Sequence, residues 1–227
     1  MPFHLRPATP HDAPHLTTIY FSAFTHDSIS LLVFPSRTPG TPSWDWWEQS
    51  ILTEMQDPCA SFLCIEDSSS GTVVAYAKWN YVTESSAEWK GDEQELPTWP
   101  LGADTEVANH FFGTLGRRRV GIMSGRTHYY LELIATHPDF QGQGAAGKLI
   151  RWGLERADKE GVECYLEASP RGKEIYEYFG FEERGRLIVP VEGREDFVEC
   201  FMVRGKRGGG VVRGEEGMVG SNAGSEV

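Results

Sequence analysis

The clearest pattern in the chain is an amphipathic stretch over residues 144–161. Its apolar residues recur at helical spacing, so they would line one face of a helix: Ala146, Leu149, Ile150, Gly153, Leu154 and Ala157. Gly161 then provides a stop signal. Residues 127–137 just before it are rich in aromatic and branched apolar side chains, which predicts a strand. The sequence therefore predicts a strand, a turn and a long helix in succession.

The remaining chain up to residue 204 also divides into strands and helices. Further strands are expected at 3–8, 60–67, 72–80, 162–169, 181–190 and 196–204. Further helices are expected at 9–24, at 41–56 (opened by Ser43), at 105–119 and at 170–179. The apolar segment 28–35 remains ambiguous. Strands and helices alternate, so we expect an α/β fold whose mixed sheet has helices on both faces.

Two segments break this pattern. Residues 82–104 hold six acidic residues against one lysine, which we interpret as an acidic loop insert in solvent. From residue 205 the chain is rich in glycine and poor in large apolar residues, which is typical of a disordered tail over 205–227. We therefore expect one domain over 1–204.

Composition narrows the possible partners. The net charge is −12, which argues against nucleic-acid binding and is compatible with a cationic small substrate, although solubility alone also explains it. The chain lacks 18 consecutive apolar residues and a signal-peptide pattern, so neither a membrane partner nor export is expected, and a cytoplasmic location is the default. Its four cysteines form no CxxC and its histidines no HExxH, so we expect no metal site.

The stretch HPDFQGQGAAG, residues 137–147, joins the predicted strand to the long helix. The first turn of a helix presents unpaired backbone N–H groups and positive potential, and bare glycines would let an anion approach them. A tight packing turn would explain the same residues. The chain has neither a GxxxxGK[ST] P-loop nor a GxGxxG dinucleotide motif, so this turn is a candidate anion site of another kind.

Two motifs in this region resemble one family. IATHPDFQGQGAAGKLI resembles the acetyl-CoA-binding motif Q/R-x-x-G-x-G/A of the GNAT acetyltransferase superfamily, with Gln141, Gly144 and Ala146 at the motif positions. The later YLEASPRGKEIYEYFGF resembles the family's strand, helix and Y-x-x-x-G-F ending, which begins at Tyr176. The resemblance covers roughly residues 3–204. It implies a GNAT-like, mostly antiparallel sheet that is splayed at the fourth strand.

The resemblance also implies acetyl-CoA as co-substrate and indicates where it would bind. The backbone of Ile134, Ala135 and Thr136 would pair with the pantetheine amides. The pyrophosphate would be held by the backbone N–H groups of Gly142, Gln143, Gly144, Ala145, Ala146 and Gly147. Ser169 stands where many relatives have a cofactor-contacting asparagine.

In this family an amine attacks the thioester directly, and the leaving thiolate needs a proton. Tyr176 occupies the position of the tyrosine that supplies it, and a phenol with a pKa of about 10 is protonated at pH 7. The alternatives are that Tyr176 only packs beside Ile175 and Phe179, or that Tyr178 is the acid.

A base is needed as well, because an alkyl amine is mostly ammonium at pH 7. Glu132 and Glu167 are the candidates, since each lies in an otherwise apolar strand and should have a partner or a purpose. Strand alternation places Glu132 on one face with Ile134 and Thr136. Either carboxylate could instead be paired elsewhere, and a relayed water could serve as the base.

Other side chains near these motifs have less specific signals. Four basic residues could face the phosphates of coenzyme A or could simply be solvated, namely Lys148, Arg151, Arg171 and Lys173. The tryptophans at 44, 46 and 47 could line an acceptor pocket or pack in the core, and Trp89 could cap the same pocket.

The function that the sequence favours is transfer of acetyl to a primary amine of a small molecule. A protein N-acetyltransferase acting on an α-amine or a lysine is the first alternative, with the acidic insert recruiting a basic peptide. A GNAT-like module that binds coenzyme A without turnover is the second. The resemblance also makes a homodimer possible.

Overall fold

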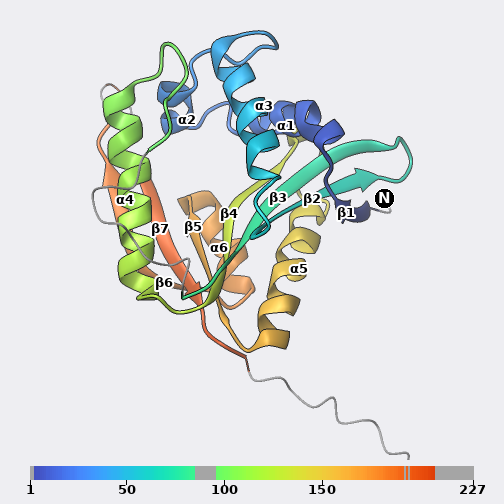
Figure 1. Cartoon of the computed structure of the whole chain (residues 1–227), viewed down its shortest axis with the longest axis vertical. Helices are drawn as coiled ribbons and strands as arrows, with labels where there is room; N and C mark the ends of the chain where they lie inside the picture. Colours follow the sequence, from blue (N-terminus) through green and yellow to red (C-terminus); the bar gives the residue numbers. More distant parts are fainter. Residues whose placement is uncertain (1–2, 85–95, 192, 194, 208–227) are drawn as a thin grey trace, which may run out of the picture.

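A computed structural model describes residues 3–84, 96–191, 193 and 195–207, and it contains one seven-stranded sheet (Figure 1). The strands are β1 (Phe3–Pro7), β2 (Ala60–Asp67), β3 (Thr72–Val82), β4 (His128–Thr136), β5 (Glu163–Ala168), β6 (Glu182–Val189) and β7 (Phe197–Arg204). Their order is β1-β2-β3-β4-β5-β7-β6, and only the β4–β5 pair is parallel. The predicted α/β fold with a mixed, mostly antiparallel sheet is confirmed.

The helices lie close to their predicted positions. They are α1 (Ala13–Ala23), α2 (Ser28–Val33), α3 (Pro42–Glu54), α4 (Thr105–Met123), α5 (Ala145–Glu160) and α6 (Pro170–Tyr178), with short 3-10 helices at Pro10–Asp12 and Pro138–Phe140. The ambiguous segment forms α2, which Asp27 caps by accepting a hydrogen bond from the Ser30 N–H at 2.7 Å. The expected start of α3 was wrong: Thr41 is its N-cap, and Ser43 is a buried residue bonded to Ser36.

The sheet separates two apolar layers. Residues of α5 and α6 pack on one face, with Trp79 and Leu131 of the sheet, whereas α1, α2, α3 and α4 cover the other face, with Tyr76 and Phe62. Figure 1 shows α4 and α5 on opposite sides of the sheet. Any ligand that reaches the middle of the sheet must therefore enter where neighbouring strands part.

Close packing of α5 on the sheet requires Gly153. A Cβ added there would lie 2.4 Å from the Trp79 ring, whose Nε1 donates to the Leu149 carbonyl. Gly153→Ala is therefore expected to lower the free energy of unfolding by about 1–3 kcal/mol in urea denaturation. Gly121→Ala in α4 is the matched control, because its Cβ would enter open space and should raise that energy by up to about 1 kcal/mol. Equal stability of both variants would contradict this packing.

The two segments that broke the sequence pattern lie partly outside the described residues, namely 85–95 of the insert, with Trp89, and 208–227 of the tail. The end of the insert contacts two helices. Trp99 stacks on Phe112 of α4 at 5.0 Å, and the Thr98 carbonyl accepts a hydrogen bond from Trp46 of α3 at 2.7 Å. Among the helices described, none is long and apolar enough to cross a membrane.

Candidate active site

The sheet opens between β4 and β5. The two strands pair only along four residues, His128–Leu131 of β4 with Glu163–Leu166 of β5. Beyond Leu131, β4 continues to Thr136, and within the described residues its sole strand partner there is β3. Backbone groups of 132–136 that face away from β3 therefore have no strand to pair with, as the predicted splay at the fourth strand requires.

The glycine turn lies directly after this unpaired edge. Gly142 and Gly144 have left-handed φ values of 73° and 88°, and a Cβ at either position would meet nothing within 4 Å. Gly144 is the N-cap of α5 and offers no side-chain cap, so the N–H groups of the first turn are left for another acceptor. Gln141 joins the turn to β4, because its Nε2 donates to the Thr136 carbonyl at 3.1 Å.

The other expected cofactor residues surround the start of α5. The Gln143 side chain is exposed and donates to the Asp139 carbonyl at 3.0 Å. Ala145 is buried and anchors the helix in the core, while Ala146 and Gly147 are half-buried. This part of the turn therefore combines an anchored helix with an accessible backbone.

The end of β5 places α6 beside the opening. Ser169 caps α6 by accepting a hydrogen bond from the Gly172 N–H at 3.3 Å. Tyr176 is 8% exposed and lies edge-on to Phe181 at 6.0 Å, whereas Tyr178 is 81% exposed. Burial raises the pKa of Tyr176, and the Glu199 carboxylate raises it further, so the phenol keeps its proton at neutral pH. Of the two tyrosines, Tyr176 is the one held inside the fold.

A β-bulge changes the predicted orientation of Glu132. The β3–β4 register passes from Lys78↔Leu133 to Trp79↔Leu131, so Glu132 is the extra residue. Ile134 packs on the α5 side, but the Glu132 carboxylate lies 2.8 Å from Lys78 Nζ. Lys78 also pairs with Glu54 of α3 at 2.8 Å, on the opposite side of the sheet. The expectation that Glu132 shares a face with Ile134 and Thr136 was therefore wrong, because the bulge interrupts the alternation.

Glu132 is thus a paired carboxylate. Besides Lys78 it accepts a hydrogen bond from Asn80 Nδ2 at 2.6 Å. Burial alone would lower the pKa of Lys78, but Glu132 and Glu54 outweigh this and raise it, which keeps the ammonium charged. A proton on Glu132 would weaken these contacts, so its geometry fits a structural carboxylate better than a base.

Glu167 has the opposite character. Alternation along β5 puts it on the face of Tyr165, away from α5, and its buried Oε1 has no hydrogen-bond partner among the residues described. Burial raises the pKa of Glu167 to about 7, against the opposing charge of Arg119 from α4. Arg119 itself lies over the Tyr130 ring at 4.3 Å. A carboxylate with this pKa can accept a proton near neutral pH.

Solved structures with the same fold are acetyltransferases from several organisms. The histone acetyltransferase HPA2 and related acetyltransferase from Corynebacterium glutamicum has a TM-score of 0.60 and 23% identity, covering 91% of this chain and 98% of that one. Arylalkylamine N-acetyltransferase 2 from Aedes aegypti has a TM-score of 0.65 and 14% identity, covering 90% and 99%. A phosphinothricin acetyltransferase from Sinorhizobium meliloti, in complex with AcCoA, has a TM-score of 0.55 and 18% identity, covering 93% and 91%.

A family model matches part of the chain. Residues 103–190 match the acetyltransferase (GNAT) domain, and this segment contains the opening, the glycine turn and α6. This match supports the GNAT acetyltransferase superfamily for residues 103–190, and the solved structures share the fold of the chain. The resemblance seen in the sequence motifs is thereby confirmed, and the opening after Leu131 corresponds to the place where the resemblance predicts coenzyme A in a GNAT fold.

Sequence reasoning missed several charged residues near the candidate site. Lys78 reaches Glu54 of α3 on the side away from α5. The charge of Arg119 lowers the pKa of Glu167, and Glu167 raises the pKa of Glu199. Lys78 and Glu199 carried a usable signal, because each is a charged residue inside an apolar strand, like the two glutamates that were singled out. Arg119 belongs to a run of three arginines, and nothing in that run distinguishes it.

The basic residues near the GNAT motifs have different surroundings. Lys148 and Arg171 are exposed, while Lys173 pairs with Glu183 at 2.7 Å and is therefore already neutralised. Arg151 lies over the Phe179 ring at 5.4 Å. Of these four residues, Lys148, Arg151 and Arg171 form no ion pair within the described part of the chain.

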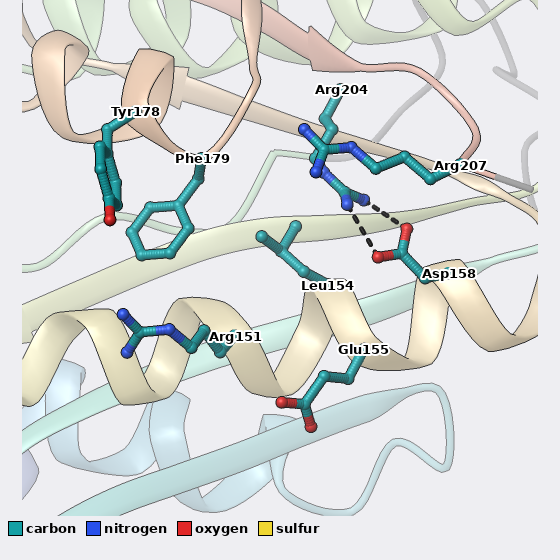
Figure 2. Close-up of a pocket in the computed structure, with 8 residues that line it drawn as sticks. All are labelled: Arg151, Leu154, Glu155, Asp158, Tyr178, Phe179, Arg204 and Arg207. Carbon is teal, nitrogen blue, oxygen red and sulfur yellow. Dashed lines mark hydrogen bonds and ion pairs between the residues drawn. The ribbon is translucent and has the colours of Figure 1, made fainter. Parts of the chain in front are cut away.

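Arg151 lines a hollow of about 450 Å³ between α5, the end of α6 and the end of β7 (Figure 2). Its lining residues are Arg151, Leu154, Glu155, Asp158, Tyr178, Phe179, Arg204 and Arg207. Arg204 and Asp158 form a two-bonded ion pair at 2.7 and 2.8 Å within it. The hollow contains none of the backbone of the glycine turn and is distinct from the opening of the sheet.

The tryptophans form part of an aromatic layer under α1 and α3. Trp44 is buried and stacks on Phe21 at 5.6 Å, so it is a core residue. Trp47 stacks on Tyr20 at 3.7 Å, and its ring lies 5.9 Å from that of Trp46. The layer covers the same side of the sheet as Lys78 and Glu132.

Proposed function

We propose that the protein transfers acetyl from acetyl-CoA to a primary amine of a small molecule by direct attack. The observation that carries this proposal is the unpaired edge of β4 beside the uncapped start of α5. Pantetheine amides would complete the hydrogen bonding of 134–136, and the pyrophosphate would accept from the N–H groups of 142–147. One cofactor therefore satisfies two sets of backbone groups that the fold leaves open.

The residues at the opening supply the proton transfers. Glu167 is half-buried, and its Oε1 has no hydrogen-bond partner among the described residues, so it takes the proton of the attacking nitrogen, whereas Tyr176 holds a proton for the departing thiolate. The net charge of −12 favours the approach of a cationic amine. The aromatic layer with Tyr20 and Trp47 suits an acceptor with an apolar body.

The test is an assay of free thiol released from acetyl-CoA by the full chain. A panel of aliphatic and aromatic primary amines is compared with a lysine peptide, a peptide with a free α-amine, and acetyl-CoA alone. We expect release above the background of hydrolysis with at least one small amine, at higher kcat/KM than with either peptide. Turnover of the peptides alone would indicate a protein acetyltransferase. Tight acetyl-CoA binding without any release would indicate a binding module.

A further inference from the structure

The hollow between α5, α6 and β7 carries more positive charge than its acidic residues offset (Figure 2). Three arginines line it against two carboxylates, in a chain whose net charge is −12. The lining comes from three separate parts of the chain, namely α5, the end of α6, and the end of β7 with the residues that follow it. An excess of guanidinium groups at one place on an acidic protein favours an anionic ligand there.

Arg204 and Asp158 form the fixed end of the hollow. Arg204 is 3% exposed, and two of its N–H groups bind the Asp158 carboxylate at 2.7 and 2.8 Å. A guanidinium group has five N–H donors, so this pair leaves three of them for other acceptors. The Nε of Arg204 is one of these, and it is buried with no hydrogen-bond partner among the residues described. Asp158 therefore offsets the charge of Arg204 without using its full capacity to donate.

Arg207 and Arg151 add two charges that the described chain does not pair. Neither forms a hydrogen bond or an ion pair among the described residues, yet each side chain has a defined place. Arg207 lies against Gly180 at the end of α6, where an added Cβ would meet its Nη2. Arg151 lies over the Phe179 ring at 5.4 Å. Both guanidinium groups are exposed residues held by packing, with their hydrogen-bond donors unused.

Glu155 is the second acidic residue of the hollow, and it does not neutralise these arginines. It is exposed and forms no ion pair within the described part of the chain. Figure 2 shows its side chain pointing away from Arg204 and Arg207. The two arginines that follow one another at the end of β7 thus share a single bound carboxylate, that of Asp158.

The opposite end of the hollow is aromatic. Tyr178 is 81% exposed, and its ring lies edge-on to that of Phe179 at 5.3 Å. Figure 2 shows these two rings on one side of Leu154 and the guanidinium groups of Arg204 and Arg207 on the other. A ligand that spans the hollow would therefore meet apolar surface at one end and positive charge at the other.

We propose that this hollow binds a small molecule in which a phosphate or carboxylate group is joined to an aromatic ring. The anionic group accepts hydrogen bonds from Arg207, and the ring packs on Leu154, Phe179 and Tyr178. A hollow of about 450 Å³ has the size of an ordinary ligand pocket. No residue of 137–147 lines it, so it is a second site beside the proposed cofactor site and does not depend on the proposed function.

The test is a ligand-observed NMR titration of the full chain with phenyl phosphate, benzoate and benzamidine. Benzamidine has the shape of benzoate and the opposite charge, so it reports on the sign of the site. We expect saturable binding of phenyl phosphate or benzoate with a Kd of about 1 mM or tighter, and at least about tenfold weaker binding of benzamidine. The tighter of the two anions identifies the group that the hollow prefers. Saturating acetyl-CoA should change either Kd by no more than about twofold, because the two sites are separate.

Two variants locate the anion and the ring. Arg207→Gln should weaken phenyl phosphate by at least about tenfold, because it removes a charge-assisted hydrogen bond. Arg118→Gln, at an exposed position of α4, changes the net charge equally and should bind as the wild type does. Tyr178→Ser should weaken phenyl phosphate by at least about threefold and leave inorganic phosphate unchanged, since only the former carries a ring.

Four results would overturn the proposal. They are the absence of binding of both anions up to about 10 mM, benzamidine binding as tightly as benzoate, equal affinities of Arg207→Gln and Arg118→Gln, and displacement of phenyl phosphate by acetyl-CoA. The last result would assign the anion to the cofactor site. Absence of thiol release in the amine assay refutes the proposed function and leaves this site standing, because none of these titrations depends on turnover.

Discussion

Gly144→Glu is expected to abolish the binding of acetyl-CoA. The glutamate side chain would extend from the N-cap of α5 into the open space where the pyrophosphate is proposed to bind. It would cover the N–H groups of the first turn and repel the phosphates. We expect an increase in Kd of at least about 100-fold in calorimetric titration, which corresponds to about 2.7 kcal/mol of binding free energy.

Gly161→Glu provides the control at the other end of the same helix. Gly161 is the C-cap of α5, has a φ of 67°, and likewise has nothing within 4 Å of an added Cβ. Both substitutions impose left-handed backbone on glutamate, at a cost of about 1–2 kcal/mol in stability. Gly161→Glu should nevertheless bind acetyl-CoA as the wild type does. Wild-type affinity in Gly144→Glu would show that residues 137–147 form only a packing turn.

Glu167→Gln is expected to remove the acid limb of the pH–rate profile. Burial raises the pKa of Glu167 to about 7, so below that pH the carboxyl group is protonated and cannot accept a proton from the amine. As the pH increases, the wild-type rate should therefore rise, with an inflection at about pH 7. In Glu167→Gln, kcat should drop by about 100- to 10,000-fold and lose this inflection. The profile of kcat from pH 5.5 to about 9 checks both statements, with the upper end set by the amine.

Glu132→Gln separates the two glutamates that the sequence left as alternatives. Glutamine would weaken the contact with Lys78, so some activity and stability should be lost, but the inflection near pH 7 should remain. If Glu132→Gln loses the inflection and Glu167→Gln keeps it, Glu132 is the base. If both variants keep the inflection, the acid limb of the pH–rate profile belongs to a relayed water or to the substrate.

Local sequence patterns were enough to locate most of the fold and the glycine turn. The period of apolar residues identified α5, and the glycines after β4 identified its exposed start, because helix periodicity and helix termini depend on neighbours in the chain. The motif that begins at Tyr176 was equally local, and the structure places this tyrosine inside the fold and Tyr178 outside. The short helix α2 was missed because six residues do not establish a period.

The tertiary structure decided which carboxylates are free. A bulge in β4 turns Glu132 to the side of α3, where Lys78 and Glu54 meet it from two other elements. Glu167 and Glu199 come from strands more than thirty positions apart in the chain and become neighbours only through the β5–β7 register. Partners of this kind depend on strand pairing over long separations, and period-2 alternation carries no information about a bulge or a register. The sequence by itself thus determined the elements, the family motifs and the candidate anion site, whereas the pairing of the sheet determined the surroundings of each acidic group.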